Sequence, residues 1–157
     1  MTDFEIERIV EKHGDRLFRY CLLILRNSSD AEDAVQETFL SLVRKNPSFR
    51  GAEHEKAWLF HVARNKCLDS LRKRKRQPEK LEENDVVRGS DEAGEEIGLF
   101  DALSRLTEIY RSVLCLYYLE EMSVEGIASL VSRTPSAVKM RLKKGRGLLK
   151  NEMEGPK

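Results

Sequence analysis

Apolar residues recur along this chain at helical spacing, and the alternation typical of strands is nearly absent. The first two apolar stretches cover residues 4–10 and 17–25. Thr2 and Glu5 have the spacing of a capping box, so a helix is predicted to begin near Asp3. We expect the second stretch to form a separate helix that ends near residue 27.

Two more helices are predicted before the middle of the chain. Ser29 and Glu32 repeat the capping-box spacing and predict a helix that continues to about residue 45. Residues 46–53 include Pro and Gly and predict a loop. A long helix is then expected from about residue 55 to residue 76.

The segment 123–142 has the pattern of two short helices joined by a tight turn. Ser123 is placed to cap the first helix, and Thr134 to cap the second, with Pro135 at its first position. The second helix has an apolar stripe and an opposite face rich in cations. This pattern is typical of a helix-turn-helix that enters the DNA major groove. An ordinary helical hairpin with a solvated basic face is the alternative. The stripe consists of Val138, Leu142 and Leu149.

Glycines are unusually placed in this segment. The turn carries Ser132 and Arg133 where many such motifs have Gly, whereas Gly145 and Gly147 fall inside the second helix. Each helical Gly costs about 1 kcal/mol relative to Ala. Close packing or a bend would each account for them.

The charges are segregated along the chain, although the formal net charge is only +1. Residues 64–80 hold eight cations and two anions, and residues 133–150 hold seven cations and no anion. Between them, residues 79–96 hold two cations and eight anions. With further helices expected at 99–105 and 107–119, the chain divides into all-helical domains at 1–77 and 97–153, joined by a flexible acidic linker at 78–96.

Composition excludes several classes of protein. The 157 residues are 40% hydrophobic and 35% charged, which is typical of a soluble protein. No apolar run approaches the roughly 20 residues of a membrane span. The first residues lack the apolar core of a signal peptide, so we expect a cytoplasmic protein.

The cysteines do not indicate a disulfide or a metal site. Cys21, Cys67 and Cys115 are odd in number and widely spaced, and the three histidines do not complete a zinc pattern. We expect buried thiols; a redox sensor is the alternative. No catalytic constellation or phosphate-binding Gly loop is present, so neither a cofactor nor an enzymatic activity is expected.

A mixed stripe marks the helix predicted from residue 29. Its members recur at i, i+3, i+4 and i+7, as a docking surface would. Acidic residues near a helix start also serve as caps, so capping is the alternative for the first of them. The stripe consists of Asp33, Gln36, Glu37 and Leu40.

The loop and the long helix after it supply candidates for nucleic-acid contact. Phe49, beside Arg50 in a polar loop, is the best candidate for contacting an unstacked base; Phe60 and His61 are weaker ones. Trp58 is expected in the core. The cations of residues 72–76 are too dense for an ordinary solvated face and should attract phosphates, although a generic polybasic tail is the alternative. The other expected core residues of this helix are Leu59, Val62, Ala63 and Leu71.

Taken together, these motifs resemble the two conserved regions of bacterial sigma factors. Residues 30–39, 49–51, 57–59 and 62–74 resemble region two, and residues 106–142 resemble region four. Nothing between them has the bulk of the intermediate domain of primary sigma factors. The chain therefore resembles the short, two-domain extracytoplasmic-function group.

The resemblance implies partners and a role for each candidate residue. The stripe on the third predicted helix would bind core RNA polymerase, and an anti-sigma factor would be a further partner. The non-template strand of the melted −10 promoter element would bind Ser48, Phe49, Arg50, Arg64, Asn65, Arg72, Lys73 and Arg74. The −35 duplex would bind Arg133, Ser136, Ala137, Lys139, Met140, Arg141 and Lys143.

Two rival functions remain at this stage. An autonomous helix-turn-helix regulator would bind duplex DNA as a dimer, but it has no need for a polymerase-docking stripe beside a loop that holds an extruded base. A helical adaptor that binds only protein is disfavoured by the two basic blocks.

Overall fold

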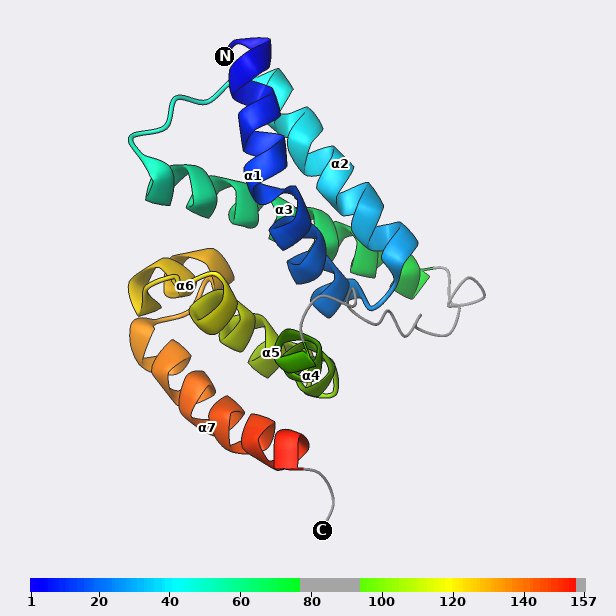
Figure 1. Cartoon of the computed structure of the whole chain (residues 1–157), viewed down its shortest axis with the longest axis vertical. Helices are drawn as coiled ribbons and strands as arrows, with labels where there is room; N and C mark the ends of the chain where they lie inside the picture. The colour runs from blue at the N-terminus through cyan, green and yellow to red at the C-terminus, as the bar shows by residue number, and fades with distance from the viewer. Residues whose placement is uncertain (77–93, 155–157) are drawn as a thin grey trace. The chain divides into compact units, whose positions relative to one another are not determined.

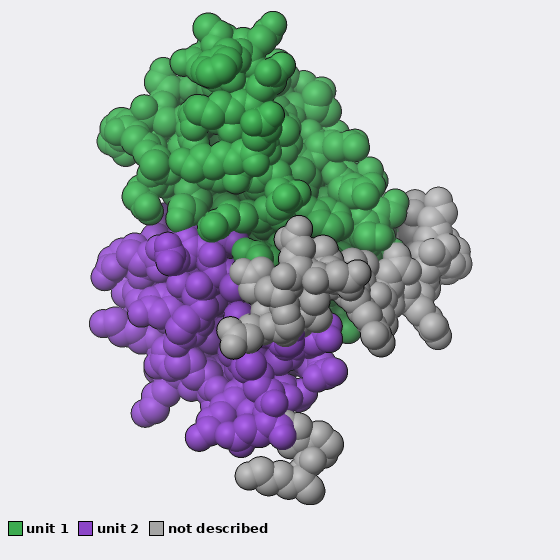
Figure 2. Space-filling model, in the orientation of Figure 1, with its two compact units in different colours: residues 1–86 green, residues 87–157 purple. Residues whose placement is uncertain are grey.

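The computed structural model describes residues 1–76 and 94–154, and the chain forms two compact units (Figures 1 and 2). The first covers residues 1–86 and the second residues 87–157. All secondary structure in the described residues is helical, which confirms the predicted all-α class. The predicted linker at 78–96 lies outside the described residues up to residue 93, and the chain is helical from Gly94. Among the described helices, none has the length and apolar character needed to cross a membrane.

The first unit is a three-helix bundle in which every helix packs on the other two (Figure 1). It consists of α1 (Asp3–Leu25), α2 (Ser28–Lys45) and α3 (Ala52–Arg76). Its core contains the fully buried side chains Leu17, Tyr20, Leu42, Leu59 and Phe60.

The predicted break between two N-terminal helices is wrong, because α1 is continuous from Asp3 to Leu25. The stripe of buried residues runs through Ile9, His13 and Leu17. The polar residue His13 therefore occupies a core position in the segment between the two apolar stretches. The capping box at the start of α1 is confirmed: the Thr2 hydroxyl accepts from the Glu5 amide, and the Glu5 carboxylate accepts from the Thr2 amide.

The predicted cap of α2 is also wrong. Asn27, and not Ser29, is the N-cap, and its side-chain oxygen accepts from the Asp30 amide at 2.9 Å. Arg26 adopts a left-handed conformation (φ 54°) and ends α1, so only two residues join the helices. A short polar side chain at this joint satisfies an amide that the helix itself leaves without a partner.

The second unit contains the predicted helix-turn-helix. Its elements are α4 (Gly94–Ser104), α5 (Glu108–Leu114), the π-helix η2 (Cys115–Leu119), α6 (Val124–Val131) and α7 (Pro135–Glu154). Both predicted caps are present, because the Ser123 hydroxyl accepts from the Gly126 amide and the Thr134 hydroxyl from the Ala137 amide. Helices α4, α5 and α6 all pack on α7.

The turn and one of the two helical glycines have physical explanations. Ser132 adopts the left-handed conformation (φ 57°) that Gly provides in other turns of this kind. Gly145 is buried in α7 against α5, where an added Cβ would lie 3.0 Å from Leu114 Cδ1. Gly147 has open space around it. Close packing therefore explains Gly145 and leaves Gly147 unexplained.

These two glycines should respond differently to the same substitution. We expect Gly147→Ala to stabilise α7 by about 0.5–1 kcal/mol, because it removes the conformational entropy of Gly without a clash. Gly145→Ala should give no gain or a loss, because its methyl group meets Leu114. Native-state hydrogen exchange of α7 amides in the full chain measures both, and equal gains would contradict this packing.

Candidate nucleic-acid and protein interfaces

The stripe predicted on α2 is exposed along its whole length. Asp33, Gln36 and Glu37 are exposed, and the Leu40 residue is 44% exposed. The opposite side of α2 is buried in the bundle. Val43, which the sequence analysis missed, follows Leu40 by three positions and is 53% exposed. We call the five residues the α2 stripe.

A polar groove runs beside the α2 stripe, between α2 and α3. Asp33 and Glu37 line it from α2, and Lys66, Asp69 and Lys73 line it from α3. Lys66 Nζ lies 4.0 Å from Glu37 Oε2. Exposed pairs of this kind contribute at most about 1 kcal/mol, so they leave the two helices able to bind other charged groups.

The loop between α2 and α3 holds the predicted base-contacting Phe49 in a defined position. Its ring packs edge-to-face against His54 (5.5 Å between centroids) and Trp58 (5.8 Å). The Arg50 amide donates to His54 Nδ1 at 3.0 Å. Phe49 and Trp58 are therefore both half-buried, whereas Ser48 and the Arg50 side chain are exposed. The expectation that Trp58 lies fully in the core is wrong, because it supports the loop from beneath.

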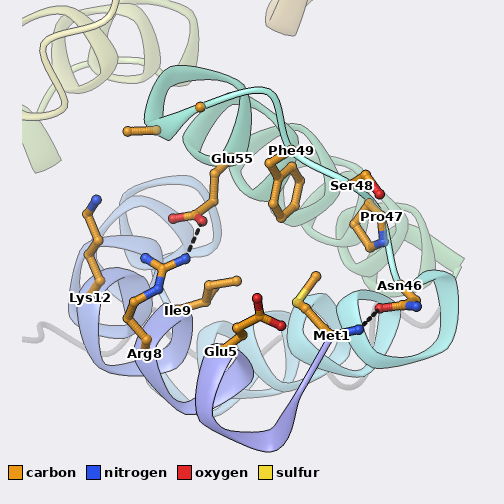
Figure 3. A pocket seen from close by; sticks show the side chains of 12 residues that line it. Met1, Glu5, Arg8, Ile9, Lys12, Asn46, Pro47, Ser48, Phe49 and Glu55 are labelled. Carbon is orange, nitrogen blue, oxygen red and sulfur yellow. Dashed lines mark hydrogen bonds and ion pairs between the residues drawn. The ribbon is translucent and has the colours of Figure 1, made fainter.

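A pocket opens between this loop and α1 (Figure 3). The loop supplies one wall, which includes Ser48 and Phe49, and α1 supplies the other. The sequence analysis missed the α1 wall entirely. Its only signal was a pair of cations at i and i+4, which is common on exposed helix faces. The pocket is lined by Met1, Glu5, Arg8, Ile9, Lys12, Asn46, Pro47, Ser48, Phe49, Gly51, Ala52 and Glu55.

A buried carboxylate links the two sides of the pocket. Glu55 Oε1 accepts from Arg8 Nη2, and Glu55 Oε2 lies within hydrogen-bonding distance of His13 Nε2, both at 2.8 Å. Glu55 and His13 are buried. Burial raises the pKa of the Glu55 carboxyl, but the hydrogen bonds from Arg8 and His13 outweigh it and leave the pKa below its ordinary value. Glu55 is therefore an anion at neutral pH.

The candidate residues of α3 divide into exposed and engaged side chains. Asn65, Arg72 and Lys73 are exposed, although Arg72 forms an ion pair with Asp69. Arg64 is half-buried, and its guanidinium donates to the Tyr20 hydroxyl at 3.2 Å. Arg64 and Asn65 lie about two turns of α3 before Arg72 and Lys73.

One aromatic candidate and one basic candidate on α3 have structural roles instead. Phe60 is completely buried and packs edge-to-face on Tyr20, so the expectation that it contacts a base is wrong. Arg74 is only 19% exposed in its side chain; it donates to the Leu25 carbonyl at 3.0 Å and to the Asp30 carboxylate at 2.5 Å. Arg74 therefore anchors the end of α3 to α1 and α2.

The recognition candidates of the second unit lie on one side of α7. Val138 and Leu142 are buried against the unit, as predicted, while Leu149 is half-buried. Met140 is 73% exposed among the polar residues of the other side. Exposed candidates are Arg133, Ser136, Lys139, Met140 and Lys143, and half-buried ones are Ala137 and Arg141.

Two other basic side chains of α7 contact aromatic residues of their own unit. Lys144 Nζ lies 5.9 Å from the centre of the Tyr110 ring, and Arg146 donates to the Tyr118 hydroxyl at 3.3 Å. They lie outside the predicted recognition set. Lys144 and Arg146 therefore differ from the candidate DNA-binding cations of α7 in having aromatic partners within the unit.

The three cysteines are buried, as predicted from the sequence. Cys21, Cys67 and Cys115 are each 0% exposed. Within residues 1–76 and 94–154, no group of His, Cys, Asp or Glu side chains has the arrangement of a metal site.

Comparisons with known proteins match both units. The family model for sigma-70 region 2 matches residues 9–77, and that for sigma-70 region 4 matches residues 98–149. An extracytoplasmic-function (ECF) RNA polymerase sigma factor of Mycobacterium tuberculosis, SigM, is 30% identical over 149 residues, covering 93% of this chain and 76% of the relative. SigE of Mycolicibacterium smegmatis is also 30% identical; the match covers 92% of this chain and only 60% of that longer protein.

Solved structures share the fold. The sigma factor RpoE of Bartonella quintana, in complex with the anti-sigma factor NepR, matches with a TM-score of 0.81 and 23% identity over 100% of both chains. CnrH, in complex with the cytosolic domain of CnrY, matches with a TM-score of 0.63 and 22% identity, covering 95% of this chain and 87% of that one.

Proposed function

This chain belongs to the ECF group of RNA polymerase sigma factors, and we propose from that premise how its surfaces divide the work of promoter-specific initiation. The α2 stripe binds core RNA polymerase. The loop and α3 bind the melted non-template strand of the −10 element. Helix α7 binds the −35 duplex. The main support is that one bundle has both an exposed stripe on α2 and a loop that lines a pocket.

The α2 stripe has the composition expected of a helix-docking surface. Leu40 and Val43 present apolar surface, and Gln36 and Glu37 supply hydrogen-bonding groups beside it. Core regions of protein interfaces combine buried apolar contacts with polar groups at the rim. A helical partner laid along α2 would cover Leu40 and Val43 and leave Asp33 near the edge.

The −10 proposal rests on the pocket beneath the loop. Extruding a base costs a few kcal/mol, which contacts in a pocket and stacking offset. Phe49 lines the pocket and is braced by Trp58, so its ring is available in a fixed position. Phosphates of the same strand would bind the exposed cations Arg72 and Lys73, with Arg64 and Asn65 nearby on α3.

The −35 proposal rests on the exposed side of α7. Lys139 and Arg141 would bind phosphates or base acceptors, and the thioether of Met140 would contact a thymine methyl group. Arg133 and Ser136 lie at the start of the helix, the end that contacts base edges in helix-turn-helix complexes. The remaining contacts would come from Ala137 and Lys143.

An anti-sigma factor and a bacterial cytoplasmic location complete the proposal. The structural relative from Bartonella quintana was solved in complex with an anti-sigma factor, which supports a partner of this kind for this chain. The chemistry of RNA synthesis would belong to the polymerase, so the sigma factor itself would not be an enzyme.

Run-off transcription tests the proposed function. Core polymerase with this protein and a genomic promoter library should give transcripts that start at specific promoters, because both DNA elements would be bound in one complex. Tight duplex binding by the free protein, with no promoter-specific transcript, would instead support the autonomous helix-turn-helix regulator.

Docking is tested by removing polar groups from the α2 stripe. We expect Gln36→Ala combined with Glu37→Ala to weaken core binding by about tenfold, since each lost interface hydrogen bond costs on the order of 0.5–1.5 kcal/mol. Equilibrium titration of labelled core polymerase measures this. Glu11→Ala, which removes an exposed carboxylate from α1, is the control, and an unchanged affinity in the double variant would exclude the stripe from the interface.

Recognition of the −35 duplex is tested by its dependence on salt. Lys139→Ala should weaken promoter binding and reduce the slope of log K against log salt by about 0.9, the amount for one lost phosphate contact on duplex DNA. Arg141→Ala should also reduce promoter-dependent initiation. Lys144→Ala is the control, because Lys144 contacts Tyr110 within the unit. If all three variants keep the wild-type slope of log K against log salt, the DNA contact lies elsewhere.

A further inference from the structure

Glu55 is an unusual residue for its position. It follows the loop directly, is 5% exposed, and lies in the first turn of α3, where its amide also donates to the Gly51 carbonyl at 3.0 Å. A buried ion pair is often no more stabilising than apolar residues of the same volume. Stability of the bundle alone therefore does not explain why an anion occupies this site.

The geometry around Glu55 points to the orientation of Arg8. One carboxylate oxygen binds Arg8 (Figure 3), and the other binds His13, so the carboxylate is held from two positions on α1. The Arg8 side chain is 47% exposed and lines the pocket. A guanidinium has five N–H donors, and one bond to Glu55 leaves donor capacity at the pocket.

An arginine that is oriented before binding loses less side-chain entropy when its ligand arrives. Holding a flexible Arg side chain in one conformation costs side-chain entropy. Lys12 lies one turn further along α1 and lines the same wall. Glu5 lines this wall too, and its carboxylate accepts from the Thr2 amide at 2.7 Å. The pocket thus combines an aromatic ring on the loop side with the cations of Arg8 and Lys12 on the α1 side, which suits a nucleotide whose phosphate binds beside Arg8.

We propose that Arg8 binds the backbone phosphate of the extruded −10 nucleotide and that Glu55 is the positioning residue that orients it. This inference rests on the proposed function of the loop and extends the strand-binding surface to α1. His13 fixes the second carboxylate oxygen, so that Glu55 presents a constant geometry to Arg8.

The test uses the full chain with core polymerase and a forked promoter whose −10 non-template strand is single-stranded. We expect Arg8→Ala to weaken binding several-fold and to lower the salt slope by about 0.7, the amount for one phosphate of a single strand. Arg8→Lys should keep the slope, because the charge remains. Binding to core polymerase without DNA should be unchanged in both variants.

Glu55→Gln gives a result whose sign is diagnostic. It removes a negative charge, so general electrostatics would strengthen DNA binding, whereas loss of Arg8 orientation should weaken it about three- to tenfold. Glu7→Gln makes the same charge change on an exposed position of α1 and should not weaken binding. Trp58 fluorescence, from the one Trp of the chain, checks that each variant retains the loop structure.

The outcomes separate this inference from the proposed function. If the wild-type complex binds the forked promoter and the Arg8 and Glu55 variants match it in affinity and salt slope, the positioning role is overturned while the sigma function stands. If the wild-type complex does not bind the single-stranded −10 segment at all, both are overturned.

Discussion

Burial of α1 is the constraint on which the first unit depends. A stripe from Ile9 through Leu17 to Leu25 is buried in the bundle, and α2 and α3 both pack on α1. Fully burying one such side chain contributes about 1.5–3 kcal/mol, which is larger than the intrinsic helix preference of any single ordinary residue in α2 or α3. Tyr20 connects the buried face of α1 to α3, because its ring packs on Phe60 and its hydroxyl accepts from Arg64. The orientation of Arg64, one of the residues proposed to bind DNA, is therefore set by contacts with the core of the bundle.

Helix α7 satisfies two demands on opposite sides. Val138, Leu142 and Gly145 are buried against the rest of the unit, and Gly145 allows Leu114 to approach the helix backbone. The other side is free of such packing and carries the cations. The Thr134 cap fixes where α7 begins, and the Ser123 cap fixes where the preceding helix α6 begins.

Local signals in the sequence were sufficient for the fold class, the helix-turn-helix and three of the caps. They failed where one residue has a distant partner. His13 interrupted the apolar pattern, yet it is a core residue because Glu55 satisfies it. Phe60 and Arg74 are residue types that often bind DNA, but both have partners inside the bundle. Phe60 packs on Tyr20, and Arg74 donates to the Leu25 carbonyl and the Asp30 carboxylate. The α1 wall of the pocket could not be predicted either, because no spacing within a helix reveals what packs opposite it.

The bonds that shape the strand-binding side of the first unit share one property. Those from Arg8 and His13 to Glu55, from Arg64 to Tyr20 and from Arg74 to Leu25 and Asp30 join residues 42 to 49 positions apart. During synthesis, a nascent chain that has released only α1 and α2 possesses none of them. The proposed polymerase-docking stripe lies entirely within α2 and is encoded earlier. The proposed strand-binding surface is thus completed last, when α3 closes the bundle, and a chain that ends before α3 has the stripe residues without that surface.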